Sequence, residues 1–163
     1  NHIAGVPLTP VPAVHSTGIA GAMIAGDLGH MLDVAGLTAY AGPPTGYVLT
    51  FSNGLVVYLS GDTGITAEQE TVVGEHYGAK LAVINIGDTF TTGPKEAAYV
   101  INKLIKPASV IPSHANQAST RDGKVIADSK TALFMKASKV PVHLPLSGRT
   151  MEFDATGKCV AGC

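Results

Sequence analysis

The sequence of 163 residues contains no tryptophan, only two cysteines and few charged side chains. Charged residues make up 14% of the chain and the net charge is −1, so nucleic acid and anionic membrane surfaces are not expected partners. No apolar run approaches the roughly 20 residues of a membrane-spanning helix, because glycine, proline and charged residues interrupt each candidate. Residues 1–14 also lack the basic start and continuous apolar core of a signal peptide. These absences argue against a nucleic-acid-binding protein and against a membrane protein.

Hydrophobic residues make up 45% of the chain, which predicts one ordered domain over residues 1–163. The two cysteines, Cys159 and Cys163, lie at the C-terminal end with three residues between them. A small disulfide loop is sterically allowed there and would indicate an oxidising compartment, whereas two unpaired thiols are the alternative. The low charge and this cysteine pair favour an exported protein, with a cytoplasmic one as the alternative.

Strand-like and helix-like segments alternate along the chain, which predicts an α/β fold. We expect strands at 11–14, 46–51, 55–59, 81–86 and 109–112, with Asn53-Gly54 as a hairpin turn. Helices are expected at 67–77, 94–105 and 130–137, and a final strand pair at 142–144 and 150–153. Residues 16–44 are rich in glycine and alanine. They indicate a long loop with a short helix near the mouth of any site.

Three of the expected strands are followed by a side chain that can bind a metal ion. His15 follows the strand at 11–14, Asp62 the strand at 55–59, and His114 the strand at 109–112. Sites in open α/β sheets lie beyond the carboxyl ends of the strands. Imidazole and carboxylate together suit zinc, iron or manganese. The pattern therefore predicts a metal site, and the alternative is that these are ordinary hydrogen-bonded residues at turns.

The order of several motifs resembles that of the metallo-β-lactamase superfamily, in particular the metal-dependent hydrolases related to L-ascorbate-6-phosphate lactonase. The resemblance covers most of residues 6–116. The matching stretches are Val11-Pro12-Ala13-Val14-His15-Ser16, Ser60-Gly61-Asp62-Thr63-Gly64, Asn85-Ile86-Gly87-Asp88, Gly93-Pro94-Lys95-Glu96-Ala97-Ala98 and Val110-Ile111-Pro112-Ser113-His114. This resemblance implies the C-terminal part of a four-layer αββα sandwich.

The resemblance also implies a metal centre and a reaction. His15 matches the third histidine of the first metal site, Asp62 the catalytic aspartate that bridges two metal ions, and His114 the last histidine of the second site. The ions would be zinc, or else manganese or iron. A metal-bound hydroxide would then attack an ester, lactone or phosphoester bond of a small-molecule substrate.

One part of the superfamily pattern is missing from the sequence. The signature of two histidines flanking one residue and followed by Asp-His supplies further ligands, and none of the six histidines forms it. We therefore expect the partner to be a complementary N-terminal segment or a second copy in a homodimer. The start at Asn1, shortly before the first matching strand, favours a separate chain or a fragment. The alternative function is a non-catalytic subunit or structural dimer that keeps the fold without a two-metal centre.

Four further residues are weaker candidates for the site. Asp88 would orient a ligand histidine, or else cap the turn that follows it. Thr63, Asn116 and His30 would contact substrate, or else make ordinary turn and surface interactions.

Overall fold

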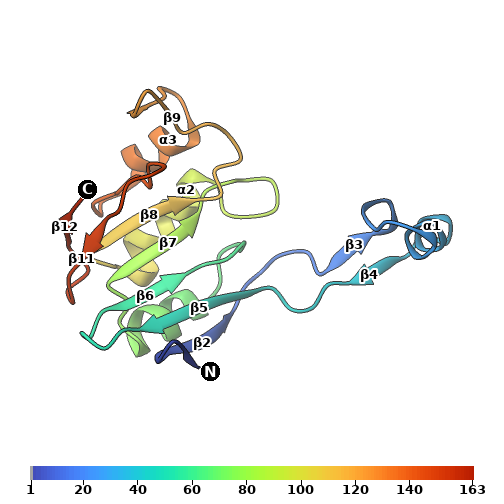
Figure 1. The fold of residues 1–163 in the computed structure, drawn as a ribbon, viewed down its shortest axis with the longest axis horizontal. Helices are drawn as coiled ribbons and strands as arrows, with labels where there is room; N and C mark the ends of the chain where they lie inside the picture. The colour runs from blue at the N-terminus through green and yellow to red at the C-terminus, as the bar shows by residue number, and fades with distance from the viewer. Residues whose placement is uncertain (1) are drawn as a thin grey trace.

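The computed structural model describes residues 2–163 and has a six-stranded sheet at its centre (Figure 1). The strand order is β1-β2-β5-β6-β7-β8. Strand β5 is antiparallel to both β2 and β6, whereas β6, β7 and β8 are parallel. Strands β2, β6, β7 and β8 therefore run in one direction and end at the same edge of the sheet. Their bounds are His2–Ile3 (β1), Val6–Pro12 (β2), Thr45–Thr50 (β5), Val56–Leu59 (β6), Leu81–Asn85 (β7) and Ser109–Ser113 (β8).

One face of the sheet is buried under the helices. Val48, Tyr58, Ala82 and Val110 are neighbours across four strands, and all are buried. They pack with apolar side chains from the helices, among them Val73, Val100, Ile101 and Phe134. Because side chains alternate between the two faces of a strand, the residues before and after these four point away from the helices.

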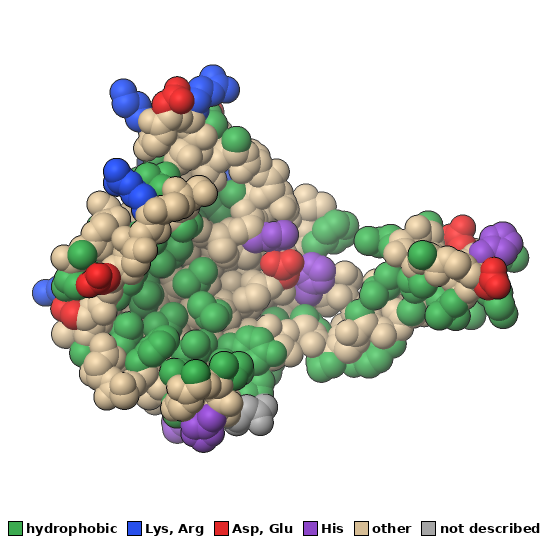
Figure 2. Space-filling model, viewed as in Figure 1, with side chains coloured by type: hydrophobic (Ala, Val, Ile, Leu, Met, Phe, Trp, Pro, Cys, Tyr) green, Lys and Arg blue, Asp and Glu red, His purple; other side chains and the backbone are tan. Residues whose placement is uncertain are grey.

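The opposite face is also apolar, but it is covered only in part. Tyr47, Leu59, Val83 and Ile111 are neighbours across the same four strands. Leu59, Val83 and Ile111 are half-buried, and Tyr47 is 37% exposed. We call these four residues the apolar face; Figure 2 shows hydrophobic side chains spread over the body of the molecule in this view. The body of the described chain thus has one large sheet with a helical layer on one face, as expected for part of an αββα sandwich.

The helices lie where the sequence predicts them. They are η2 (Gln69–His76), α2 (Pro94–Tyr99) continued by η3 (Val100–Ile105), and α3 (Lys130–Ala137); η2 and η3 have wide π-helical turns. Glu96 accepts a hydrogen bond from the Gly93 N–H at 3.0 Å, and Ser129 accepts one from the Ala132 N–H at 3.1 Å. Both bonds satisfy N–H groups that have no partner within the helix.

The first long strand differs from the prediction. It spans Val6–Pro12 rather than 11–14, and its ladder with β5 runs from Leu8 to Pro12. The prolines do not prevent pairing because β1 reaches only the start of β2, so most of β2 is an edge strand on that side. His15 therefore lies three residues beyond the strand, in the segment that leaves the sheet.

The C-terminal strand pair also differs from the prediction. Strand β11 (Glu152–Phe153) pairs with β12 (Cys159–Ala161), whereas Val142 makes only an isolated parallel bridge with Val110. The predicted pair of 142–144 with 150–153 is wrong, because the segment around Val142 extends the sheet beside β8 instead. A short hairpin of β9 (Thr120–Arg121) and β10 (Lys124–Val125) precedes α3.

Residues 17–41 form an arm that projects from the body of the molecule (Figure 1). Strands β3 (Gly18–Ala20) and β4 (Thr38–Tyr40) pair along it, and η1 (Gly21–Met23) and α1 (Asp27–Val34) form its tip. The Ala41 N–H donates to the Thr17 carbonyl at 2.7 Å and closes the base of the arm. A loop near the mouth of the site was expected over this stretch, but α1 lies at the far end of the arm. None of the helices in residues 2–163 has the length and apolarity needed to cross a bilayer.

Candidate metal centre

Asp62 and His114 meet at the edge where the parallel strands end. Asp62 lies three residues beyond β6, and His114 directly follows β8. The Nε2 atom of His114 is 3.4 Å from Oδ2 of Asp62, and the two side chains are 42% and 46% exposed. An imidazole and a carboxylate that face each other while open to solvent can both reach one cation.

Asn85, at the end of β7, holds the turn that carries Asp62. Its side-chain oxygen accepts hydrogen bonds from the Ser60 hydroxyl at 3.0 Å and from the Thr63 N–H at 3.4 Å. Its amide nitrogen donates to the Thr63 carbonyl and to Thr92 Oγ1, both at 2.9 Å. Asn85 is fully buried, so these bonds are made away from water. The amide thus fixes the residues on both sides of Asp62.

The loop that carries His114 has an unusual backbone. His114 and Asn116 have φ angles of 46° and 57°, in the left-handed region that residues other than glycine rarely adopt. Gly87 makes this path accessible: a Cβ there would collide with the His114 carbonyl and lie 2.7 Å from Asn116 Nδ2. Lys130, the first residue of α3, donates a hydrogen bond from its side-chain nitrogen to the Gly87 carbonyl. Backbone strain of this kind is concentrated at functional sites.

His15 lies next to the Asp62 turn through its neighbours in the chain. The Val14 N–H donates to Thr63 Oγ1 at 3.0 Å, and the Gly64 N–H donates to the Val14 carbonyl at 2.8 Å. The Nδ1 atom of His15 is 3.2 Å from the carbonyl oxygen and from the hydroxyl of Ser16. The described chain does not bring the ligand atoms of His15, Asp62 and His114 within 4.8 Å of one another. Asp62 and His114 are thus paired, and the backbone before His15 is bound to the same turn.

The other candidate residues have varied surroundings. Thr63 is buried, and its hydroxyl donates to the Gly64 carbonyl while accepting from Val14, so it positions the backbone. Asp88 is exposed, and its Oδ1 atom accepts a hydrogen bond from the Thr89 N–H at 2.9 Å. Asn116 lies beside Gly87 and His114. His30 lies in α1, at the tip of the arm and away from the Asp62–His114 pair.

A hollow of about 240 Å³ opens beside His114. Polar side chains of Ser113, Gln117 and Thr131 line it together with Leu144 and Leu146.

Two residues of this site were missed by sequence reasoning. Asn85 carries a weak signal, since it is the one polar residue at the end of an otherwise apolar strand. Lys130 carries none, because its contact with Gly87 depends on where α3 packs.

The comparisons with known proteins agree with the predicted superfamily. No family model matches the chain. A UPF0173 metal-dependent hydrolase of Polynucleobacter asymbioticus is 36% identical over 113 residues, which cover 69% of this chain and 38% of that protein. The chain thus spans well under half the length of this curated relative.

Solved structures show the same fold. Igni18, a metallo hydrolase from the archaeon Ignicoccus hospitalis, superposes on 96% of this chain and 53% of its own with a TM-score of 0.57 and 24% identity. The metallo-β-lactamase fold protein YhfI from Bacillus subtilis covers 91% of this chain and 50% of its own, with a TM-score of 0.56 and 10% identity. The expected fold class, that of metallo-β-lactamase fold proteins, is therefore confirmed.

Proposed function

We propose that this chain forms the C-terminal part of a metal-dependent hydrolase. Its fold is that of metallo-β-lactamase fold proteins, and its sequence is similar to those of metal-dependent hydrolases. In this proposal it contributes His15, Asp62 and His114 to the metal centre. The observation that carries the proposal is the approach of Asp62 to His114 at the edge where β2, β6 and β8 all end.

The donor set fits zinc, with manganese or iron as alternatives, because one carboxylate and two imidazoles suit all three metals. When bound, a pair of such ions lowers the pKa of coordinated water towards about 7 and offsets negative charge that develops on the substrate. Asp62 offsets part of the cationic charge, and Asn85 holds its turn in place. His114 is one of the residues that line the neighbouring hollow.

The substrate class in this proposal is a small molecule with an ester, lactone or phosphoester bond. The hollow beside His114 has polar groups at Ser113, Gln117 and Thr131 for orientation and apolar contacts at Leu144 and Leu146. Part of the substrate would lie there, with its reacting bond towards Asp62 and His114.

The remaining ligands would come from an N-terminal segment that covers the apolar face. Tyr47, Leu59, Val83 and Ile111 form an incompletely covered apolar row, and such a row is stabilised when another element packs on it. The relatives' greater length supports this occupant, since 38% of the Polynucleobacter protein matches this chain. A second copy of the chain is the alternative occupant, and light scattering distinguishes the two because only the second copy makes the isolated chain a dimer.

The test combines metal content with turnover in the protein that carries both segments. His114→Ala should lower the bound metal and abolish hydrolysis of an ester, lactone and phosphoester panel, while circular dichroism stays unchanged. His76→Ala is the matched control, since His76 lies exposed on η2 among the helices. Equal metal content in the two variants would refute the role of His114 as a ligand, and the absence of turnover in the unsubstituted protein and both variants would favour the non-catalytic subunit.

A further inference from the structure

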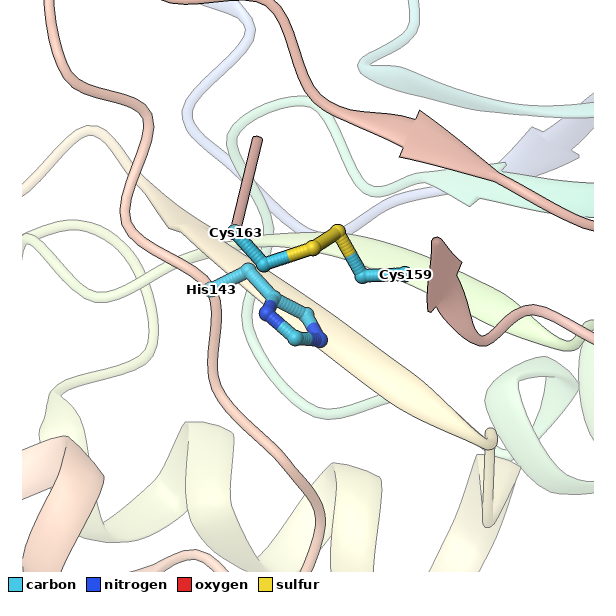
Figure 3. Close-up of side chains that lie close together, drawn as sticks. All are labelled: His143, Cys159 and Cys163. Carbon is cyan, nitrogen blue, oxygen red and sulfur yellow. A yellow bond between two sulfur atoms is a disulfide. The ribbon is translucent and has the colours of Figure 1, made fainter. Parts of the chain in front are cut away.

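A second group of metal-binding side chains lies far along the chain from Asp62 and His114. His143, Cys159 and Cys163 place one ligand atom each within 4.8 Å of one another, and no other group of three meets this criterion in residues 2–163. Figure 3 shows the His143 imidazole next to the two sulfur atoms, which are joined in a disulfide. The imidazole and the sulfurs come from separate segments of the chain.

Independent contacts hold these two segments together. The His143 N–H donates to the Val110 carbonyl at 2.9 Å, which fixes this segment along β8. The His143 ring packs edge-on against Phe153 of β11, with centroids 5.5 Å apart, and Phe153 packs on the cluster of Leu55, Val57 and Leu81. Strand β12, which begins at Cys159, pairs with β11. The imidazole is therefore held beside Cys159 whether or not the disulfide is present, and Cys163 lies two residues beyond the end of β12.

We propose that Cys159, Cys163 and His143 form a binding site for a borderline-soft divalent cation such as Zn²⁺ when the disulfide is reduced. The two cysteines are separated by three residues, within the spacing of cysteine pairs in zinc sites, and their Cα atoms lie 6.2 Å apart. Two thiolates and one imidazole are typical zinc ligands, and a water molecule completes four-coordination.

The exchange between the two forms balances in protons and electrons. A dithiol reductant transfers two electrons and two protons, its own sulfurs join in a disulfide, and the bond between Cys159 and Cys163 breaks to give two thiols. The cation then displaces one proton from each thiol to the solvent, while neutral His143 donates a nitrogen lone pair.

Cation binding would constrain the chain more than the disulfide does. The disulfide joins residues four positions apart and closes a very small ring. A cation bound to all three residues would also tie residue 163 to residue 143 and close a much longer loop. Because the entropy removed from the unfolded chain increases with loop length, the reduced and metal-bound form should fix the C-terminal hairpin against β8.

The test titrates the reduced full chain with Co²⁺ under anaerobic conditions, after the dithiol has been removed. We expect one equivalent of Co²⁺ to produce a thiolate-to-cobalt charge-transfer band in the near ultraviolet. The oxidised chain should give no such band. The band requires a cobalt–sulfur bond, so Co²⁺ held by His15, Asp62 or His114 does not contribute to it, and His114→Ala should leave it unchanged.

Paired variants test the contribution of the imidazole. His143→Phe keeps a ring against Phe153 and removes both nitrogen donors. The Co²⁺ dissociation constant should therefore rise on the order of 10- to 100-fold or more, because even replacing a residue that only hydrogen-bonds to a metal ligand has effects of that size. His76→Phe is the control, because His76 also packs edge-on against an aromatic ring, that of Tyr77 at 4.7 Å, and lies exposed on η2.

Two results would overturn the proposal. One is the absence of a charge-transfer band in the reduced chain with Co²⁺ in large excess. The other is an equal dissociation constant for His143→Phe and His76→Phe, which would leave the cysteine pair alone as a weak ligand. As a second measurement, made with His114→Ala in both proteins to weaken the proposed Asp62–His114 site, Zn²⁺ should raise the Tm of the reduced chain but not that of the Cys159→Ser/Cys163→Ser variant.

Discussion

The Nε2 atom of His114 lies 3.4 Å from Oδ2 of Asp62, although strand β7 separates the strands from which the two residues extend. Parallel pairing on both sides of β7 brings the ends of β6 and β8 to one edge. The end of β7 itself carries Asn85, whose buried amide binds the Asp62 turn. The middle strand thus supports the candidate site, and the two flanking strands carry its two proposed ligands.

Replacing Asn85 should weaken both the fold and the metal centre. Asn85→Ala removes the buried partner of the Ser60 hydroxyl and of the Thr63 and Thr92 groups. Each group left unpaired should lower the free energy of unfolding by about 1–3 kcal/mol. Urea unfolding and metal titration of the variant measure the two effects. Asn102→Ala is the control: Asn102 also bonds two backbone groups, at Ala137 and Lys139, away from the edge. A variant Asn85→Ala with wild-type metal affinity would contradict a supporting role for this amide.

Adding one methyl group at Gly87 should displace His114. The Cβ of Gly87→Ala would collide with the His114 carbonyl and with Asn116, and overpacking of this kind destabilises by about 1–3 kcal/mol. We expect a lower Tm and weaker metal binding. Gly64→Ala is the comparison, because its Cβ would have no neighbour closer than 3.8 Å, at Val14. Equal Tm values for the two variants would show that the His114 loop moves freely.

Stability should fall at alkaline pH because of Tyr58. Burial raises the pKa of the Tyr58 hydroxyl above its ordinary value of 10.0, and a hydrogen bond with Gln69 opposes this in part. The folded state therefore holds the phenolic proton more tightly than the unfolded state. This contribution is complete below about pH 10 and is lost as the pH rises from there through the folded-state pKa.

Urea unfolding between pH 8 and pH 11 checks this expectation. Tyr58→Phe should flatten the alkaline part of the profile, whereas Tyr40→Phe, at an exposed ring in the arm, should leave it unchanged. Identical slopes for the wild type and Tyr58→Phe would rule out the buried phenol as the source.

The arm should be removable without loss of the sheet. Thr17 and Ala41 are hydrogen bonded at its base, so an Asn-Gly turn can replace residues 18–40. We expect the free energy of unfolding to change by about 1 kcal/mol or less, the scale of loop-closure effects. Removal should also reduce self-association, because Met23, Leu28, Met31, Val34 and Tyr40 expose large apolar side chains on the arm. Thermal unfolding and light scattering measure both, and loss of folding would show that the arm stabilises the body.

The sequence allowed the hairpin of β5 and β6 to be predicted, because Asn53-Gly54 is a strong local signal, and the predicted bounds of α3 also agree with the structure. Asp62 and His114 were proposed as ligands because each follows an apolar strand, and the structure brings their side chains together. Strand β2 was placed too late, because its prolines read locally as the approach to an edge or bulged strand, whereas they lie within its ladders. The contacts of Asn85 and Lys130 were not predicted from the sequence. Asn85 bonds Ser60 and Thr63, and Lys130 bonds Gly87, and each of these partners lies more than 20 residues away in sequence. The arm lacks the periodicity that would have indicated its strands.

Asp62 and His114 are both more than two-fifths exposed, whereas the residues that support them are buried. Substituting either residue therefore removes little packing. A descendant of this chain could lose the proposed metal site by a single change and still fold as before. Such a descendant would need Asn85 and Gly87 for its fold, so these two positions would record its ancestry better than Asp62 and His114.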